Sequence, residues 1–167
     1  YIFMTKLAMP KIDRKLIAKK TEIIAGLKKI IRTENILDHE DEIRPFETDA
    51  LSAYKQKPLV VVFPENTKEV SKVLAYCNQH RIKVVPRGSG TGLSGGALPL
   101  ADSLLLCLGK FNKIINIDYK NRCVVAQPGV TNLSITQAVE DKNFYYAPDP
   151  SSQIACSIGG NVAENSG

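Results

Sequence analysis

A glycine-dense segment between two apolar runs constrains this chain more than any other feature. Residues 86–97 read PRGSGTGLSGGA and contain five of the eleven glycines in the 167-residue chain. Glycine permits positive φ angles and lets successive backbone N–H groups face one concavity, an arrangement that binds anions. A purely structural turn needs only one or two glycines. The segment therefore predicts a phosphate-binding loop.

The loop matches two nucleotide-binding motifs, but its context fits neither. Gly90, Gly92 and Gly95 have the GxGxxG spacing of dinucleotide-binding folds, and an apolar run precedes them. In a Rossmann fold such a loop opens a helix that receives the pyrophosphate, whereas here Pro99 and the apolar run 103–108 follow. No Lys-Ser or Lys-Thr closes the glycine run, as a Walker A loop requires. A nicotinamide-dependent dehydrogenase remains an alternative function, which the demonstration of a bound flavin would exclude.

The sequence around the loop predicts a parallel βαβ unit. Residues 59–63 form a valine-rich run between two prolines, which is typical of a buried strand. Asn66 begins a helix, with Glu69 at the capping-box position. We expect the buried stripe of this helix to contain Val70, Val73, Leu74 and Cys77. Further strands are predicted at 83–86 and 103–108, and tight connections between strand, helix and strand favour parallel pairing.

The remaining segments give weaker signals. Residues 114–118 and 122–127 are expected to form a strand pair, and 131–140 a short helix capped by Thr131. Residues 38–49 are acidic and lack periodicity, so we expect a loop there. Residues 143–167 are also expected to be loop-like.

The excess positive charge lies at the N-terminal end. Residues 1–33 contain nine Lys or Arg and two acids, a balance of 9 − 2 = +7, whereas the whole chain carries +5. Apolar residues at helical spacing predict one or two amphipathic helices within 11–31. No aromatic residues interleave with the lysines, which argues against nucleic-acid binding. The basic face is interpreted as solvated, with peripheral membrane binding or partner-subunit docking as alternatives.

Cysteine and histidine usage argues against a metal site and favours a reducing compartment. The four cysteines form no CxxC pair, and the two histidines have no partner at ligand spacing. We expect buried reduced thiols at Cys77 and Cys107. The N-terminus lacks a secretory signal, and Met4 is a candidate for the natural start. The prediction is a cytoplasmic protein, with attachment to the inner face of the membrane as the alternative.

A second polar stretch offers further ligand contacts. Residues 148–167 read PDPSSQIACSIGGNVAENSG, in which Gly159 and Gly160 allow close backbone approach. The serines and Asn161 offer hydrogen bonds. Two such loops about sixty residues apart predict an extended, phosphate-containing ligand held from two sides. Taken alone, the second stretch is also compatible with an ordinary polar loop.

Four motifs together resemble a known family. They are VVPRGSGTGLSGGALP at 84–99, QPGV at 127–130, PDPSS at 148–152 and SIGGNVAENSG at 157–167. In this order they resemble the FAD-linked oxidases of the vanillyl-alcohol-oxidase, or PCMH, type. The resemblance is strongest to the branch of D-lactate dehydrogenase and the glycolate oxidase D-subunit.

The resemblance implies an α+β fold with FAD in the cleft between two lobes. We expect an N-terminal helical extension and loop at 1–45. A first lobe with a small parallel βαβ unit would occupy 46–110, and the start of an incomplete second α+β lobe 111–167. The chain is thus expected to be an N-terminal fragment.

The resemblance also assigns cofactor contacts. The residues expected to wrap the FAD pyrophosphate are Pro86, Arg87, Gly88, Ser89, Gly90, Thr91, Gly92, Ser94, Gly95 and Gly96. Those expected to line the ribityl and isoalloxazine side are Pro148, Asp149, Pro150, Ser151, Ser152, Gly159, Gly160, Asn161, Ser166 and Gly167. In many relatives a histidine at the place of Thr91 bonds covalently to the flavin. Thr91 cannot, so we expect non-covalent FAD.

The implied reaction is oxidation of a D-2-hydroxy acid, D-lactate or glycolate, to the 2-oxo acid by hydride transfer to FAD. The resemblance places the catalytic base, the substrate contacts and any metal beyond Gly167, so this chain alone is expected to be inactive. The electron acceptor is left unspecified. A sugar-lactone oxidase, an aryl-alcohol oxidase and a non-catalytic FAD-binding subunit remain alternatives.

Overall fold

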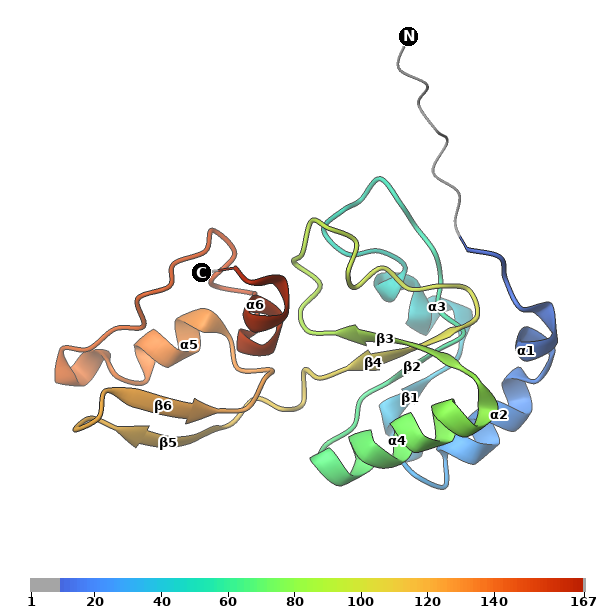
Figure 1. Cartoon of the computed structure of the whole chain (residues 1–167), viewed down its shortest axis with the longest axis horizontal. Helices are drawn as coiled ribbons and strands as arrows, with labels where there is room; N and C mark the ends of the chain where they lie inside the picture. Colours follow the sequence, from blue (N-terminus) through green and yellow to red (C-terminus); the bar gives the residue numbers. More distant parts are fainter. Residues whose placement is uncertain (1–9, 167) are drawn as a thin grey trace, which may run out of the picture.

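The computed structural model describes residues 10–166, so Met4 and Gly167 lie outside the described residues. These residues form two lobes that meet at the glycine-rich segment (Figure 1). The first lobe contains α1 (Arg14–Ala18), α2 (Lys20–Leu27), β1 (Ile36–Leu37), α3 (Glu40–Ile43), β2 (Val60–Val62), α4 (Thr67–His80), β3 (Lys83–Arg87) and β4 (Ser103–Cys107). The second contains β5 (Ile114–Asp118), β6 (Cys123–Ala126), α5 (Asn132–Gln137) and α6 (Ile158–Glu164). Short 3-10 helices lie at Thr33–Asn35, Arg44–Phe46 and Glu140–Lys142.

The first lobe is built on a four-stranded sheet with the order β1-β2-β4-β3. Both β2 and β3 run parallel to β4, and Leu105 is paired with Val61 on one side and with Val85 on the other. The predicted parallel βαβ unit is therefore confirmed, with β4 inserted between its two strands. The antiparallel edge strand β1 is an addition that the sequence did not indicate, because two residues are too few to show a period.

Helices cover both faces of this sheet (Figure 1). The predicted basic segment forms α1 and α2, and Ile24, Leu27 and Ile31 share one apolar cluster with β2, β4 and α4. On the other face Ile43 packs with Val61 and Leu105. Residues of β1 and α2 therefore pack in the core of the first lobe although they precede residue 45. The domain boundaries expected from the sequence, at 45/46 and 110/111, stay predictions.

The helix predicted to follow β2 is present, with two corrections. The Asn66 side chain accepts a hydrogen bond from the Glu69 N–H at 3.0 Å, but the Glu69 carboxylate accepts from the Glu65 N–H at 2.8 Å, so the reciprocal half of the capping box is shifted by one residue. Leu74 is 44% exposed and does not belong to the buried stripe. Tyr76 packs against α2 instead, where it lies directly over Gly26.

Residues 38–49, expected to be a loop, contain α3 and the 3-10 helix Arg44–Phe46. Three acidic residues occupy the first turn of α3, where they complement the helix dipole. The Glu42 carboxylate also accepts a hydrogen bond from the His39 N–H at 3.4 Å. Four residues are too few to show an apolar period, and the contact of buried Ile43 with the sheet adds to these local interactions.

The second lobe begins with the predicted strand pair. β5 and β6 form an antiparallel hairpin, and Asp118 accepts a hydrogen bond from the Asn121 N–H across the turn at 3.0 Å. Thr131 caps α5 as expected, accepting from the Ser134 N–H at 3.2 Å. α5 ends at Gln137, three residues earlier than predicted.

The loop expected at 143–167 ends in a helix, α6. Ser157 caps it by accepting a hydrogen bond from the Gly160 N–H at 3.3 Å. A Cβ on Gly159 would lie 2.6 Å from Cβ of Pro128, so this glycine allows the helix to approach the chain between the lobes. Glycine content predicted a loop in this segment, whereas Gly159 lets α6 pack closely against Pro128.

The four cysteines are free, and Cys77 and Cys107 are buried as predicted. Burial raises the pKa of Cys77 to about 11 and that of Cys107 to about 12. Both are therefore protonated thiols at neutral pH.

Candidate functional site

The two loops singled out in the sequence line one cavity at the junction of the lobes. It has a volume of about 710 Å³ and is bounded by the glycine loop after β3, by residues 150–152 and by the start and end of α6. Of the predicted contacts, the cavity is lined by Pro86, Arg87, Gly88, Ser89, Gly90, Thr91, Gly92, Ser94, Gly96, Pro150, Ser151, Ser152, Gly159, Gly160, Asn161 and Ser166. Gly95, Pro148 and Asp149 are not among its lining residues. Their assignment to the cofactor, like that of the lining residues, stays a prediction.

The glycine loop leaves its backbone donors free. Within residues 10–166, none of the ten N–H groups of 88–97 donates a hydrogen bond to protein. Gly90 and Gly95 have φ angles of +75° and +76°, a region that residues with a Cβ rarely adopt. A Cβ on Gly90 would also collide with the Arg87 guanidinium. Since backbone donors require a partner, this run is suited to a ligand rich in acceptor oxygens.

No helix follows the loop. The chain passes through Pro99, which is buried, and enters β4 at Ser103. The loop therefore lacks the helix N-terminus on which the Rossmann arrangement depends, in agreement with the argument from sequence.

Arg87 fixes the beginning of the loop. Its guanidinium donates a hydrogen bond to the Thr48 carbonyl oxygen at 2.7 Å and lies over the Phe46 ring, 5.7 Å from the centroid. Leu51 reaches the other end of the loop, with Cδ2 3.5 Å from the position of a Cβ on Gly95. The segment 46–51 thus supports the loop at both ends, a role that no sequence motif indicated.

The opposite wall is held by buried polar contacts. Asn132 is 1% exposed and donates through Nδ2 to the Pro148 carbonyl oxygen at 2.9 Å. Its Oδ1 accepts from Nδ2 of Asn161 at 3.1 Å. Asn161 was predicted to contact the ligand, but its amide nitrogen is committed to Asn132. The walls touch where Gly88 packs against the Ser157 side chain, a contact that leaves no room for a Cβ on Gly88.

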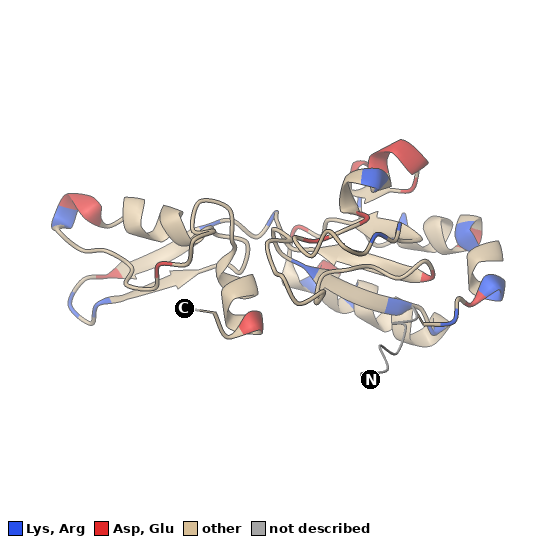
Figure 2. Ribbon diagram, turned by 90° about the horizontal axis from the view of Figure 1, so that it is seen from above, with Lys and Arg blue, Asp and Glu red and all other residues tan. Residues whose placement is uncertain are grey.

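Charge is scarce around the cavity. Among residues 10–166, the charged residues that line it are Arg87 and Glu164, and Figure 2 shows few coloured segments at the junction. The other lining residues that were not among the predicted cofactor contacts are Leu93, Ala97, Leu108, Pro128, Cys156, Ser157 and Ala163, of which only Ser157 carries a polar hydroxyl group. Since Arg87 is engaged elsewhere, an anion in this cavity depends mainly on backbone N–H groups.

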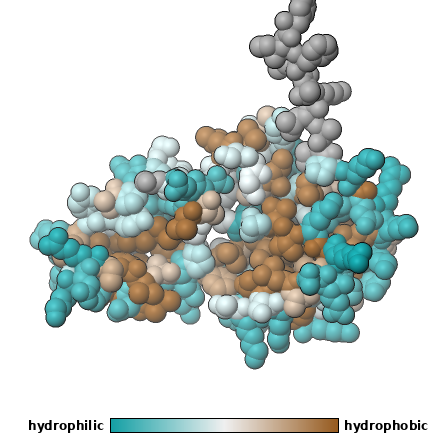
Figure 3. Space-filling model, in the orientation of Figure 1, coloured by the Kyte–Doolittle hydropathy of each residue, from teal (hydrophilic) through white to brown (hydrophobic). Residues whose placement is uncertain are grey.

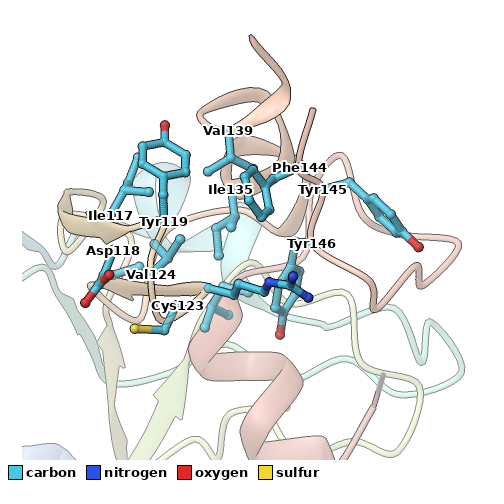
Figure 4. Close-up of a pocket in the computed structure, with 13 residues that line it drawn as sticks. Ile117, Asp118, Tyr119, Cys123, Val124, Ile135, Val139, Phe144, Tyr145 and Tyr146 are labelled. Atoms are coloured by element: carbon cyan, nitrogen blue, oxygen red, sulfur yellow. The ribbon is translucent and has the colours of Figure 1, made fainter. Parts of the chain in front are cut away.

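A second cavity of about 520 Å³ lies between the β5–β6 hairpin and α5. Figure 4 shows Ile135, Val139 and Phe144 pointing into it, and Tyr145 directed away. None of the predicted site residues lines it. We therefore take the cavity at the glycine loop as the candidate functional site.

Comparison with known proteins gives a consistent picture. A family model described as an FAD binding domain matches residues 58–167. The glycolate oxidase subunit GlcD of Escherichia coli K12 is 51% identical over 160 residues, which are 96% of this chain and 31% of that protein. The D-lactate dehydrogenase of Anaerostipes hadrus is 36% identical over 83% of this chain and 29% of its own length. The chain thus spans about a third of these relatives.

Among solved structures, p-cresol methylhydroxylase superposes with a TM-score of 0.77, covering 93% of this chain and 30% of that one at 21% identity. A likeness at this identity concerns the fold alone. In the part of the chain that the structure describes, no helix is both long and apolar enough to cross a membrane.

Proposed function

This chain belongs to the FAD binding domain family, and we propose that it holds FAD non-covalently in the cavity between its two lobes. In this proposal the glycine loop binds the diphosphate, and the wall formed by 150–152 and α6 lines the flavin side. When bound, FAD supplies the hydride acceptor. The residues of this chain bind and orient it.

The free backbone donors of the glycine loop carry the proposal. Ten consecutive N–H groups that have no partner in the part of the protein the structure describes, with positive φ at Gly90 and Gly95, form a cradle for acceptor oxygens. The second wall adds Ser151, Ser152 and Ser166 within the same cavity. An extended ligand with phosphates in the middle and hydroxyl groups to one side matches this distribution of donors.

For the complete polypeptide we propose oxidation of a D-2-hydroxy acid, such as glycolate or D-lactate, to the 2-oxo acid. The names of the relatives support this substrate class. Because the chain covers about a third of their length, we assign the proton-abstracting and carboxylate-binding residues to sequence outside it. Oxidation of glycolate or D-lactate by the complete polypeptide with an artificial electron acceptor tests the assignment, and turnover of neither would contradict it.

The basic helices offer a candidate contact with a partner subunit. Lys15 of α1 is exposed, and so are Lys19, Lys28 and Lys29, which flank α2, whereas the apolar faces of both helices are buried. The E. coli relative is described as a subunit. We propose that this face docks on an acidic surface of another subunit, with an anionic membrane surface as the alternative.

Replacement of Gly90 by valine tests the cofactor site. The substitution places a β-branched side chain at φ +75° against the Arg87 guanidinium, so we expect the purified complete polypeptide to lose most of its flavin. Gly109→Val is the matched control, because a Cβ at Gly109 meets no atom within 4 Å. Full flavin content in Gly90→Val, measured by absorbance, would contradict the assignment.

Acid precipitation of the holoprotein tests the mode of attachment. Thr91 lines the cavity and has no nucleophilic nitrogen for a flavin bond. All FAD is therefore expected in the supernatant. Flavin that stays with the precipitate would show a covalent bond to another residue.

A further inference from the structure

The cavity contains a carboxylate where the proposed function requires room for a diphosphate. Glu164 is the last residue of α6, and its side chain reaches the glycine loop. Its Oε1 lies 2.8 Å from the position of a Cβ on Gly96 and 3.3 Å from that on Gly92. One carboxylate oxygen thus lies in the space that side chains would occupy at two glycines of the same loop.

No cation neutralises this carboxylate within residues 10–166. The ion pairs within 4.0 Å among these residues do not include Glu164. The other charged residue of the cavity, Arg87, is directed to Thr48 and Phe46. A second anion brought to the same glycines would therefore meet an uncompensated like charge.

On the basis of the FAD site proposed above, we propose that the Glu164 carboxylate competes with the cofactor's diphosphate for the glycine loop. It occupies the loop in the cofactor-free protein and leaves when the diphosphate enters. The exchange needs only side-chain rotation, because Glu164 is exposed and stands at the helix end, followed by Asn165 with φ +52°. The carboxylate thereby lowers affinity for flavins that carry phosphate and leaves affinity for riboflavin unchanged.

Equilibrium titration tests this competition. The complete polypeptide, stripped of flavin, is titrated with FAD and with riboflavin while flavin fluorescence is followed. The test variant is Glu164→Gln, and the control is Glu140→Gln, which removes the same charge at an exposed position of the second lobe outside the cavity. We expect Glu164→Gln to bind FAD about two- to fivefold more tightly at low ionic strength. The gain should shrink in about 0.5 M salt, where screening is strong.

The outcomes separate three cases. Tighter FAD binding by Glu164→Gln alone, with riboflavin affinity unchanged, supports the inference. Unchanged FAD affinity overturns it, and so does an equal loss for FAD and riboflavin, which would show that Glu164 accepts a hydrogen bond from flavin hydroxyls. A wild-type polypeptide that binds no FAD overturns the proposed function and this inference together.

Discussion

The two lobes differ in how deeply their strands are buried. Every residue of β2 and β4 is buried, and helices cover both faces of their sheet. In the hairpin of the second lobe no residue is fully buried, and Ile115 and Val125 are 64% and 50% exposed. Figure 3 shows apolar side chains at the surface of this lobe.

Most of the buried apolar side chains belong to the first lobe, whereas the second lobe buries fewer of them and is also held by polar pairs and close backbone contacts. Asn132, at 1% exposure, joins α5 to α6 and to the Pro148 segment. Gly159 lets α6 rest against Pro128. The glycine loop thus projects from a stiff scaffold, and the wall that faces it is held by a few directional bonds. Substitutions in the two lobes should differ accordingly.

The largest effect is expected from Leu105→Ala. Leu105 is 0% exposed at the centre of the sheet, so its removal should lower the free energy of unfolding of the complete polypeptide by about 3 to 5 kcal/mol. Chemical denaturation followed by circular dichroism measures the loss. Leu74→Ala is the control, because Leu74 is 44% exposed and should change stability by less than about 1 kcal/mol. Equal effects at the two positions would remove the basis of the comparison.

Asn132→Ala should lower the free energy of unfolding by about 2 to 3 kcal/mol, because it leaves the Pro148 carbonyl and the Asn161 amide without their hydrogen-bond partner. Hydrogen exchange should show the loss of protection in α5 and α6 and not in β2 or β4. The exposed Asn112 makes no side-chain hydrogen bond within residues 10–166, so Asn112→Ala serves as the control. Loss of protection spread over both lobes would show that they unfold as one unit.

Asp102→Asn tests a charged anchor in the first lobe. The Asp102 carboxylate accepts from Lys83 Nζ at 2.8 Å and from the Asp13 N–H at 2.7 Å. Burial opposes its ionisation, yet these bonds outweigh burial and hold the pKa of Asp102 below its usual value. A lowered folded pKa stabilises the protein above the unfolded pKa of about 4.

We therefore expect Asp102→Asn to lower the free energy of unfolding by about 2 kcal/mol at pH 7, since hydrogen bonds to a charged carboxylate are replaced by bonds to a neutral amide. The difference from the wild type should shrink as the pH falls below about 4 and through the folded pKa. Denaturation at pH 7 and at acid pH measures it, and the loss in Asn132→Ala, a neutral pair, should stay constant. A deficit that persists unchanged at acid pH would refute the charged anchor.

Val125→Ala should lower the free energy of unfolding least, by about 0.5 kcal/mol or less, since Val125 is half exposed on β6. Thermal unfolding of the complete polypeptide measures it. A loss as large as that of Leu105→Ala would show that sequence outside this chain buries the hairpin.

The sequence predicted the first lobe better than the second, for physical reasons. Five consecutive apolar residues at 59–63 and the Asn66 cap carry strong local signals, and β2 and α4 confirm them. The burial predicted for Leu74 was wrong, and Tyr76 packs against α2 instead, because helical period alone does not say which of two nearby residues faces α2. α6 was missed because Gly159 and Gly160 disfavour helices intrinsically, and the contact that requires Gly159 is with Pro128, thirty-one positions earlier.

For the candidate site, composition identified the glycine loop, and order along the chain identified its partner segment. The sequence could not show that the Asn161 amide donates a hydrogen bond to Asn132, or that the Arg87 guanidinium donates one to the Thr48 carbonyl, since both bonds join distant segments. Glu164 lies inside a recognised motif, yet nothing in the sequence indicates that its carboxylate rests on Gly92 and Gly96.

The contact between Gly88 and Ser157 has a consequence for protein synthesis. The ribosome makes the glycine loop about seventy residues before it makes the helix start on which that loop rests. During that interval the nascent loop has only one wall, and its free N–H groups face solvent. FAD is therefore expected to join the polypeptide only after α6 has left the ribosomal exit tunnel.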